Sequence, residues 1–382
     1  MQCKFLTNGI TLDLNRVLKP CCTFQPGKEY IEKFNIANTS IEQWQSSDEL
    51  QTLKTQLDNN EWPAECVRCE KIESAGRRDS VRLNGESAYS NLADGEYVLE
   101  IRPGNVCNFA CQTCWPRASS RVQNFYRKAN IDFIASDSSA IDYEILNPIK
   151  NKIKHVAVLG GEPFYDPQCK KFFAWMETNR VNANYIIFTN GSELDRSFLQ
   201  STDNIITLVF SLDAVGKPAE YIRFGTQWEK VLDNFRFAKT LPNVKVRVNV
   251  TQSPYNYFYF PDLVEWLCED WPEVVTFGIA YISEHFTNNR VAAGVFPLSQ
   301  RSHMIERLQK CISVLRTSKI PKDQKSNAVN AVLDVIKDLE TLPYDQQQHK
   351  EFLEFVQKLD TVKNIKIYDY CPDLAACLDI NL

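Results

Sequence analysis

The chain has 382 residues, enough to bury a sizeable core as one large domain with an appendage or as two domains. Apolar residues make up 44% of it and charged residues 24%, and the formal net charge of −5 argues against a strongly basic surface for nucleic acid. No apolar run is long enough to span a membrane, and the first residues lack the apolar segment of a signal peptide. The sequence therefore predicts a cytoplasmic protein.

Cysteine is the unusual residue, with 13 copies against four histidines. An odd number of cysteines in a chain of this size does not suit the disulfide framework of a small secreted protein. The cysteines cluster near the start of the chain, which favours thiolates held on metal in a reducing compartment. The scarcity of histidine favours iron–sulfur or four-cysteine zinc sites. The early group is Cys3, Cys21, Cys22, Cys66, Cys69, Cys107, Cys111 and Cys114. The others are predicted to be buried thiols: Cys169, Cys268, Cys311, Cys371 and Cys377.

Residues 1–96 contain few long stretches in which apolar residues recur at regular spacing, and we expect them to form a small metal-dependent module. From residue 98 onward, short β-branched or aromatic runs recur. The stretches between them are long enough for a helix, as in the amphipathic Gln168–Thr178 and Trp228–Leu241. The predicted strands are Val98–Pro103, His155–Gly160, Tyr185–Thr189, Thr207–Leu212, Val244–Val250 and Val275–Ile282.

Strands that alternate with helices indicate βαβ units and a parallel sheet with right-handed crossovers. Six such units predict an α/β fold with an open, partial (β/α)6 barrel over residues 97–285, whose chemistry lies at the carboxyl ends of the strands. Residues 286–382 are predicted to be a helical extension with a connector at Ser318–Lys325. Its helices are expected at Ser299–Leu315, Asn327–Leu339 and Gln346–Leu359.

A three-cysteine motif, Cys107-Asn-Phe-Ala-Cys111-Gln-Thr-Cys114, follows the first predicted strand. Three thiolates on one short loop can hold three irons of a cubane and leave the fourth iron open to a ligand. A zinc knuckle or a set of buried structural thiols is the alternative. Zinc, however, needs a fourth ligand nearby, and neither His nor a further Cys follows within the loop.

The second predicted strand ends in Gly-Gly-Glu-Pro at residues 160–163. Adjacent glycines let the backbone approach a ligand closely, and a carboxylate follows them. An ordinary strand-to-helix turn is the alternative for this segment taken alone. Its place at the tip of the strand after the cysteine loop favours a shared site.

Together, the cysteine loop and the Gly-Gly-Glu-Pro segment resemble the signature of the radical S-adenosylmethionine (SAM) superfamily. The resemblance covers roughly residues 97–285. It implies a [4Fe–4S] cluster on the three loop cysteines, with SAM on the open iron. It also implies that Gly160, Gly161, Glu162 and Pro163 form the segment that binds the amino group of the SAM methionine.

Further strand ends look like cofactor positions of that family. Ser211 and Asp213 resemble contacts to the SAM ribose or carboxylate, and Arg223 resembles an arginine that pairs with the carboxylate. The full set implied by the resemblance is Thr189, Asn190, Ser211, Asp213, Arg223 and Asn249. One departure is Thr113, where many members have an aromatic residue; Trp115 follows the last cysteine instead, so the side chain near the adenine stays open.

The earlier cysteines resemble the SPASM/Twitch modules that carry an auxiliary iron–sulfur cluster. Those modules have one Cys, then a Pro-Cys, then a Cys-x-x-Cys, which here correspond to Cys3, Cys21, and Cys66 with Cys69. Cys22 could replace Cys21 or Cys3. The module precedes the predicted barrel, whereas SPASM modules usually follow it. Structural zinc is the alternative.

The resemblance implies reductive cleavage of SAM to methionine and a 5′-deoxyadenosyl radical, which abstracts hydrogen from a substrate. A peptide or protein residue is the first expectation, and a nucleotide, nucleobase or sugar is the rival. The auxiliary cluster would anchor the substrate or accept an electron, and a flavodoxin or ferredoxin would be the electron donor. A non-catalytic metal-binding scaffold is the alternative of another class.

Overall fold

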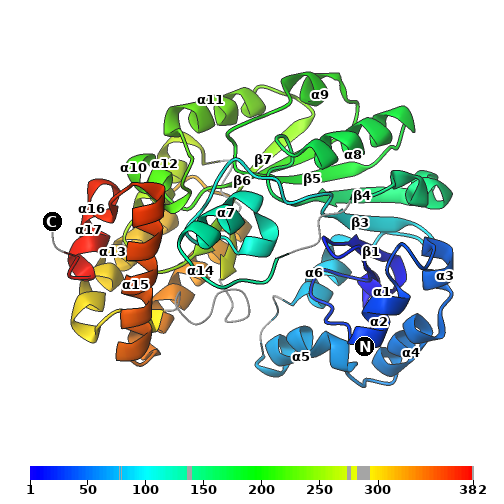
Figure 1. Cartoon of the computed structure of the whole chain (residues 1–382), viewed down its shortest axis with the longest axis horizontal. Coiled ribbons are helices and arrows are strands. Elements are labelled where there is room, and N and C mark those ends of the chain that lie inside the picture. The colour runs from blue at the N-terminus through cyan, green and yellow to red at the C-terminus, as the bar shows by residue number, and fades with distance from the viewer. Residues whose placement is uncertain (77, 79, 136–139, 273–276, 282–292, 381–382) are drawn as a thin grey trace. The chain divides into compact units, whose positions relative to one another are not determined.

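The computed structural model describes residues 1–76, 78, 80–135, 140–272, 277–281 and 293–380 (Figure 1). It contains two compact units, each made of separate stretches of the chain. The first unit comprises Met1–Asn105, Ser136–Ile187 and Thr202–Ile206, and the second comprises Val106–Ala135, Phe188–Ser201 and Thr207–Leu382. Both mix strands with helices, so the α/β class is confirmed.

Strands of the first unit are hydrogen-bonded in the order β2-β1-β3-β4-β5. They are β1 (Gly9–Leu12), β2 (Leu18–Lys19), β3 (Tyr97–Ile101), β4 (Ile153–Val158) and β5 (Asn184–Thr189). The last two residues of β5 are assigned to the second unit. β1, β3, β4 and β5 run parallel, and β2 runs antiparallel to β1. Leu99, Ile101 and Val156 are fully buried, as is typical of parallel strands covered on both faces.

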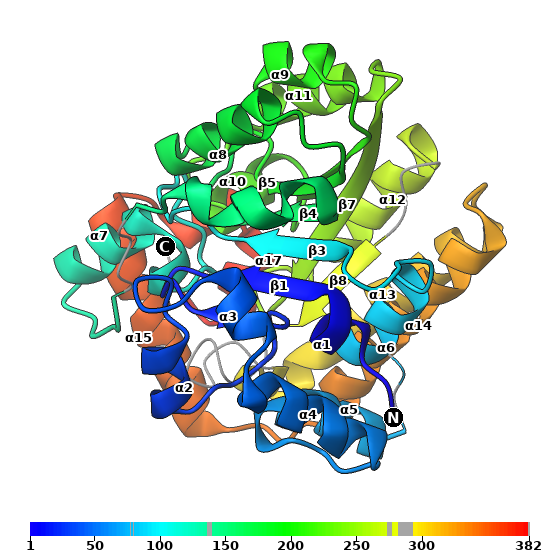
Figure 2. The same ribbon diagram turned by 90° about the vertical axis from the view of Figure 1, so that its right-hand side faces the viewer.

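Short helices of the first unit precede β3, and Figures 1 and 2 show α1 and α3 beside β1. They are α1 (Lys4–Asn8), α2 (Lys28–Lys33), α3 (Ile41–Gln45), α4 (Asp48–Asp58), α5 (Val67–Ser74) and α6 (Val81–Ala88). Ser40, Ser47 and Ser80 cap the starts of α3, α4 and α6, because each side chain accepts a hydrogen bond from the first turn. A 3-10 segment, Tyr143–Lys152, leads into β4, and α8 (Pro167–Thr178) follows that strand.

Strands of the second unit are β6 (Ile206–Ser211), β7 (Val244–Gln252) and β8 (Phe277–Tyr281), in that order, with β7 parallel to β8. Ile206, the first residue of β6, is assigned to the first unit. Two groups of helices accompany them. The first is α7 (Ser120–Lys128), α9 (Arg196–Ser201), α10 (Gly216–Ile222), α11 (Trp228–Lys239) and α12 (Phe260–Asp270). The C-terminal group is α13 (Leu298–Thr317), α14 (Lys322–Thr341), α15 (Gln346–Lys363), α16 (Ile367–Tyr370) and α17 (Pro372–Cys377).

All six predicted strands are confirmed within a few residues at their ends. For Val275–Ile282, the outer positions 275, 276 and 282 lie outside the described residues. The predicted helices are confirmed as α8, α11, α13, α14 and α15. The five later cysteines are indeed buried. No helix in the part of the chain that the structure describes is long and apolar enough to cross a membrane.

Two sequence expectations need correction. The connector at Ser318–Lys325 is wrong in its second half, because α14 already begins at Lys322 after Pro321, a residue whose fixed φ suits a helix start. Helix α15 runs past its predicted end at Leu359 and stops at Lys363, where Asn364 adopts a left-handed conformation with φ 53°. The structure also adds β1, which joins the sheet of the first unit beside β3.

Candidate cofactor site

The three-cysteine loop is anchored against the end of α10 and the residues that follow it. The backbone N–H of Ala110 donates to the carbonyl of Phe224 at 2.8 Å, and that of Gln112 donates to the carbonyl of Ile222 at 2.7 Å. Cys111 lies between these two anchored residues. The protein's own hydrogen bonds therefore fix the backbone that carries the central thiol.

Gly225 lets this supporting segment approach the loop closely. Its φ is +112°, a backbone conformation that residues other than glycine rarely adopt. A Cβ added there would lie 3.0 Å from the Asn108 carbonyl oxygen. Arg121 also donates a hydrogen bond from Nη1 to that carbonyl. Both backbone conformation and space therefore require glycine at this position.

We expect Gly225→Ala to lower the free energy of unfolding by about 1–3 kcal/mol, because alanine would be strained at this φ and crowded by the loop. Thermal and urea melts measure the change. Gly27→Ala is the matched control, since Gly27 has φ −69° and open space around it, and it should stay within about 0.5 kcal/mol of the parent. Equal melts for the two variants would contradict the close support described here.

A polar network surrounds Cys107. Asn190 donates from Nδ2 to Asn108 Oδ1 at 2.9 Å, and the same nitrogen lies 3.9 Å from the Cys107 sulfur. Ser192 donates from its backbone N–H and its hydroxyl to Asn190 Oδ1, at 2.9 Å and 2.6 Å. Asn108 donates from Nδ2 to the Ser192 hydroxyl at 2.8 Å. The structure thus brings the predicted residue Asn190 to the cysteine loop.

Arg223 and Asp213 form a buried ion pair in the same unit. Arg223 Nη1 lies 2.9 Å from Asp213 Oδ2, and Asp213 Oδ1 accepts a hydrogen bond from the Thr251 N–H at 2.8 Å. Asp213 is fully buried, and both of its oxygens are engaged within the protein. Among the described residues, Arg223 Nε is buried and makes no hydrogen bond. This leaves one oriented guanidinium donor for an anionic group.

Burial keeps the thiols of the loop protonated when no metal is bound. Burial raises the pKa of the Cys111 thiol, and Arg223 and Lys363 oppose this rise only in part. Burial also raises the pKa of Cys114, where the neighbouring Cys111 and Cys107 add to the effect. Burial alone would lower the pKa of Arg223, but Cys111 and Asp213 more than reverse this, so the net shift is upward. Neutral thiols are thus favoured until a metal replaces their protons.

The remaining predicted strand-end residues of this unit have ordinary structural partners. Thr189 is buried, and its hydroxyl accepts a hydrogen bond from the Gly191 N–H at 3.0 Å. Asn249 accepts a hydrogen bond from the Leu212 N–H through its backbone carbonyl at 3.0 Å. Ser211, the last residue of β6, is half-buried. Their roles toward a cofactor remain predictions.

The Gly-Gly-Glu-Pro segment forms a tight turn after β4 in the first unit. Gly160 has φ +149°, and a Cβ there would lie 2.8 Å from the Gly104 carbonyl oxygen, so the two backbones meet without room for a side chain. Glu162 is fully buried, and its Oε1 accepts a hydrogen bond from the Phe164 N–H at 3.4 Å. Gly161 is half-buried and Pro163 is buried.

The N-terminal cysteines, also in the first unit, comprise four that interact with one another and a fifth, Cys22, that interacts with Cys21. Burial raises the pKa of Cys3 to about 12, with further increases from Cys21 and Cys69. Burial likewise raises the pKa of Cys66, where Cys21, Cys3 and Cys69 add to the effect. Cys22 is exposed as a residue, but burial raises the pKa of its thiol as well, and Glu100 and Cys21 add to this rise. The four mutually interacting thiols are Cys3, Cys21, Cys66 and Cys69.

Both thiol sets have donors that suit an iron–sulfur cluster, since each contains several cysteines that influence one another's pKa. Over the described ranges, no group of three or more His, Cys, Asp or Glu side chains already stands in position to hold a metal ion. The fit of the cysteine loop therefore rests on its donor chemistry and on the free Arg223 Nε beside it, and not on the present positions of the sulfur atoms.

Sequence reasoning missed Asn108 within the cysteine loop and three residues that contact the loop: Arg121, Ser192 and Lys363. Asn108 lies inside the cysteine motif, and Ser192 comes two residues after Asn190, so both could have been found by reading the neighbours of predicted residues. Lys363 lies far along the chain at the end of α15, where no local pattern marks it.

Comparisons with known proteins give only weak similarity. Neither a family model nor a curated protein matches the sequence. Among solved structures, anSMEcpe with bound AdoMet is 18% identical, with 48% of this chain and 52% of that chain covered and a TM-score of 0.38. Streptococcus suis SuiB bound to S-adenosylmethionine is also 18% identical, with 71% and 59% covered and a TM-score of 0.39.

A second structure of SuiB, bound to precursor peptide SuiA, is 17% identical, with 71% of this chain and 60% of that chain covered and a TM-score of 0.40. The chain thus spans little more than half the length of these structures.

Proposed function

We propose that this chain is a radical SAM enzyme that holds a [4Fe–4S] cluster on Cys107, Cys111 and Cys114, with one iron open to SAM. The observation that carries the proposal is the three-cysteine loop, whose backbone is anchored by the protein and whose thiols lie beside buried Arg223. Three thiolates leave a fourth cluster position free, whereas a closed structural zinc site would need a fourth protein ligand.

When bound, this cofactor pair supplies one-electron reductive cleavage of SAM to methionine and a 5′-deoxyadenosyl radical that takes hydrogen from the substrate. The protein's residues bind and orient the pair. Arg223 offers its free Nε to the SAM carboxylate, while Asp213 holds the guanidinium in place. Asn190 fixes the Cys107 end of the loop, and residues 160–163 receive the SAM amino group.

The fold that fits this chemistry is a partial (β/α)6 barrel over residues 97–285. Strands β3 to β8 alternate with helices, as such a barrel requires. We assign residues 1–96 to an auxiliary-cluster module and residues 286–382 to a helical extension. The boundary at residue 285 itself lies outside the described residues.

The auxiliary cluster is proposed on Cys3, Cys21, Cys66 and Cys69. Its support is the Pro-Cys and Cys-x-x-Cys order of these cysteines in the sequence, together with the effect that the thiols have on one another's pKa. Exposed Cys22 is left out of the ligand set. Structural zinc on the same four thiols is the competing assignment.

The proposed substrate is a residue of a peptide or protein, in keeping with the SPASM/Twitch-like order of the N-terminal cysteines. A nucleotide, nucleobase or sugar is the alternative. A reduced flavodoxin or ferredoxin in the cytoplasm is the proposed electron donor. A non-catalytic metal-binding scaffold is the alternative of another class.

The test is SAM cleavage by the chain reconstituted anaerobically with iron and sulfide. After reduction with dithionite, we expect slow formation of 5′-deoxyadenosine and methionine even without substrate, measured by liquid chromatography. Formation of methylthioadenosine or S-adenosylhomocysteine would indicate different SAM chemistry. Intact SAM in the presence of a reduced cluster would favour the scaffold.

A further inference from the structure

Lys363, the last residue of α15, reaches the centre of the three-cysteine loop. Its ammonium donates to the Ala110 carbonyl oxygen and to Gln112 Oε1, each at 2.9 Å. Only 8% of its surface is exposed. Because Ala110 and Gln112 flank Cys111, one buried side chain holds both neighbours of the central thiol.

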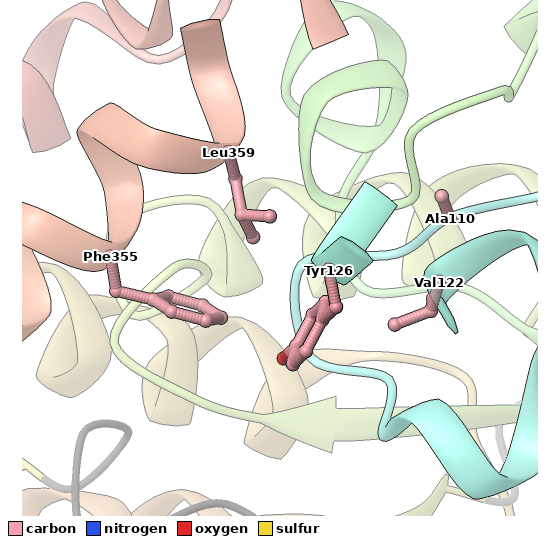
Figure 3. Close-up of a cluster of buried hydrophobic side chains, with 5 residues drawn as sticks. All are labelled: Ala110, Val122, Tyr126, Phe355 and Leu359. Atoms are coloured by element: carbon pink, nitrogen blue, oxygen red, sulfur yellow. The ribbon is translucent and has the colours of Figure 1, made fainter. Parts of the chain in front are cut away.

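Apolar packing holds α15 in the position that this contact requires. Phe355 and Leu359 of α15 join a buried cluster with Ala110 of the loop and with Val122 and Tyr126 of α7 (Figure 3). The rings of Tyr126 and Phe355 meet edge to face, with centroids 5.8 Å apart. Phe355, Leu359 and the helix end at residue 363 are spaced four residues apart, so they share one face of α15.

A second polar contact joins α15 to the segment that supports the loop. Asp360 Oδ1 accepts a hydrogen bond from the Tyr221 hydroxyl at 2.8 Å, and its Oδ2 accepts one from the Ile367 N–H at 2.8 Å. Tyr221 comes directly before Ile222, whose carbonyl anchors Gln112. The end of α15 therefore contacts both the loop and its support.

The ammonium of Lys363 also places a positive charge beside the cysteine loop. Its ammonium lies over the rings of Phe125 and Phe224, 5.8 Å and 5.3 Å from their centroids, which keeps it among apolar groups where water screens it poorly. Burial lowers the pKa of the Lys363 ammonium to about 7, and Cys111 and Asp360 oppose this fall. Thiolates and a cluster on the loop would add further negative charge nearby and so favour the ammonium form. A nearby cation stabilises the more negative, reduced state of a cluster.

We propose that Lys363 is a positioning residue that holds residues 110–112 of the cysteine loop and raises the reduction potential of the cluster bound there. This inference rests on the proposed function, because it concerns the same cluster. It makes the C-terminal helical extension part of the cofactor site.

The test is a redox titration of the reconstituted chain, followed by electron paramagnetic resonance. The signal that changes when SAM is added identifies the loop cluster. Lys363→Met removes the charge and keeps an apolar stem. We expect at least a tenfold fall in the ratio of reduced to oxidised cluster at fixed potential, which corresponds to a fall of about 59 mV in the one-electron midpoint potential. Lys363→Arg keeps the charge and should keep the parent potential more closely.

Lys358→Met is the matched control, since it removes the same charge from an exposed position of the same helix and should leave the midpoint unchanged. An unchanged midpoint in Lys363→Met would overturn the inference and leave the proposed function standing. A parent chain that takes up no iron–sulfur cluster would overturn both.

Hydrogen exchange on the parent chain covers the case in which Lys363→Met does not fold. Loading of the cluster should increase the protection of amides 360–366 together with that of 110–112, because Lys363 links the two segments. Amides 346–350, at the far end of α15, serve as the internal reference. Greater protection of the loop alone would contradict the role of Lys363.

Discussion

Replacing Cys107, Cys111 and Cys114 together with alanine is expected to remove about half of the iron from the reconstituted chain, and SAM cleavage should fall to background. If both thiol sets hold [4Fe–4S] clusters, the parent carries about eight irons and the triple variant about four. Iron and acid-labile sulfide analysis measures the first effect, and the 5′-deoxyadenosine assay measures the second.

The apo fold should survive this substitution, which makes the result interpretable. Burial raises the pKa of Cys111 and Cys114 above their ordinary value of 9.0, so without metal at neutral pH both are uncharged thiols. Their removal therefore takes away no ion pair with Arg223. The loop backbone is anchored through Ala110 and Gln112, whose hydrogen bonds do not involve the sulfur atoms.

Cys311→Ala is the matched control for the triple variant. Cys311 is a fully buried thiol of the same unit in α13, away from the cysteine loop in sequence. We expect it to keep the parent's iron content and SAM cleavage. A triple variant that keeps all its iron, or a parent chain that binds only zinc, would show that the cluster assignment is wrong.

Much of the fold could be predicted because it depends on local sequence patterns. Leu99, Val156 and Leu208 lie in short apolar runs, and the structure buries all three in strands. Buried strands of parallel sheets have this continuous apolar character, so the runs could be located without any tertiary information. The cysteine spacing and the Gly-Gly-Glu-Pro segment were visible for the same reason.

Tertiary contacts explain what the sequence could not show. β1 is only four residues long, and its pairing with β3 joins segments almost 90 residues apart. Gly225 combines a positive φ with a close approach of the Asn108 carbonyl, and no sequence pattern of a turn indicates that contact. Lys363 looks like an ordinary helix-ending lysine, and only the fold brings its ammonium to the cysteine loop.

The N-terminal thiols should be separable from SAM cleavage. Cys66→Ala combined with Cys69→Ala is expected to remove the other half of the iron while substrate-free cleavage of SAM to 5′-deoxyadenosine continues. The reason is that the open iron of the cluster proposed on Cys107, Cys111 and Cys114 would itself bind SAM, so cleavage would not need a second cluster. Turnover of the true substrate should be lost, because the auxiliary cluster acts on substrate binding or later electron transfer.

Stability has to be measured alongside the two activities. Cys66 and Cys69 lie at the start of α5, a helix of eight residues in which Cys69 is the buried residue, so metal binding contributes to the local fold. We expect the double variant to melt at a lower temperature than the parent, and we expect a chelator to shift the parent in the same direction. Cys22→Ala is the control, since this exposed cysteine lies outside the proposed ligand set and its removal should change neither iron content nor melting.

The metal content of the double variant distinguishes the two assignments of this site. Loss of iron and sulfide relative to the parent supports an auxiliary iron–sulfur cluster, whereas loss of zinc with iron unchanged identifies a structural zinc site. A double variant that melts like the parent but no longer cleaves SAM would contradict the separation of roles. In that case the thiols of the first unit would themselves take part in the SAM chemistry.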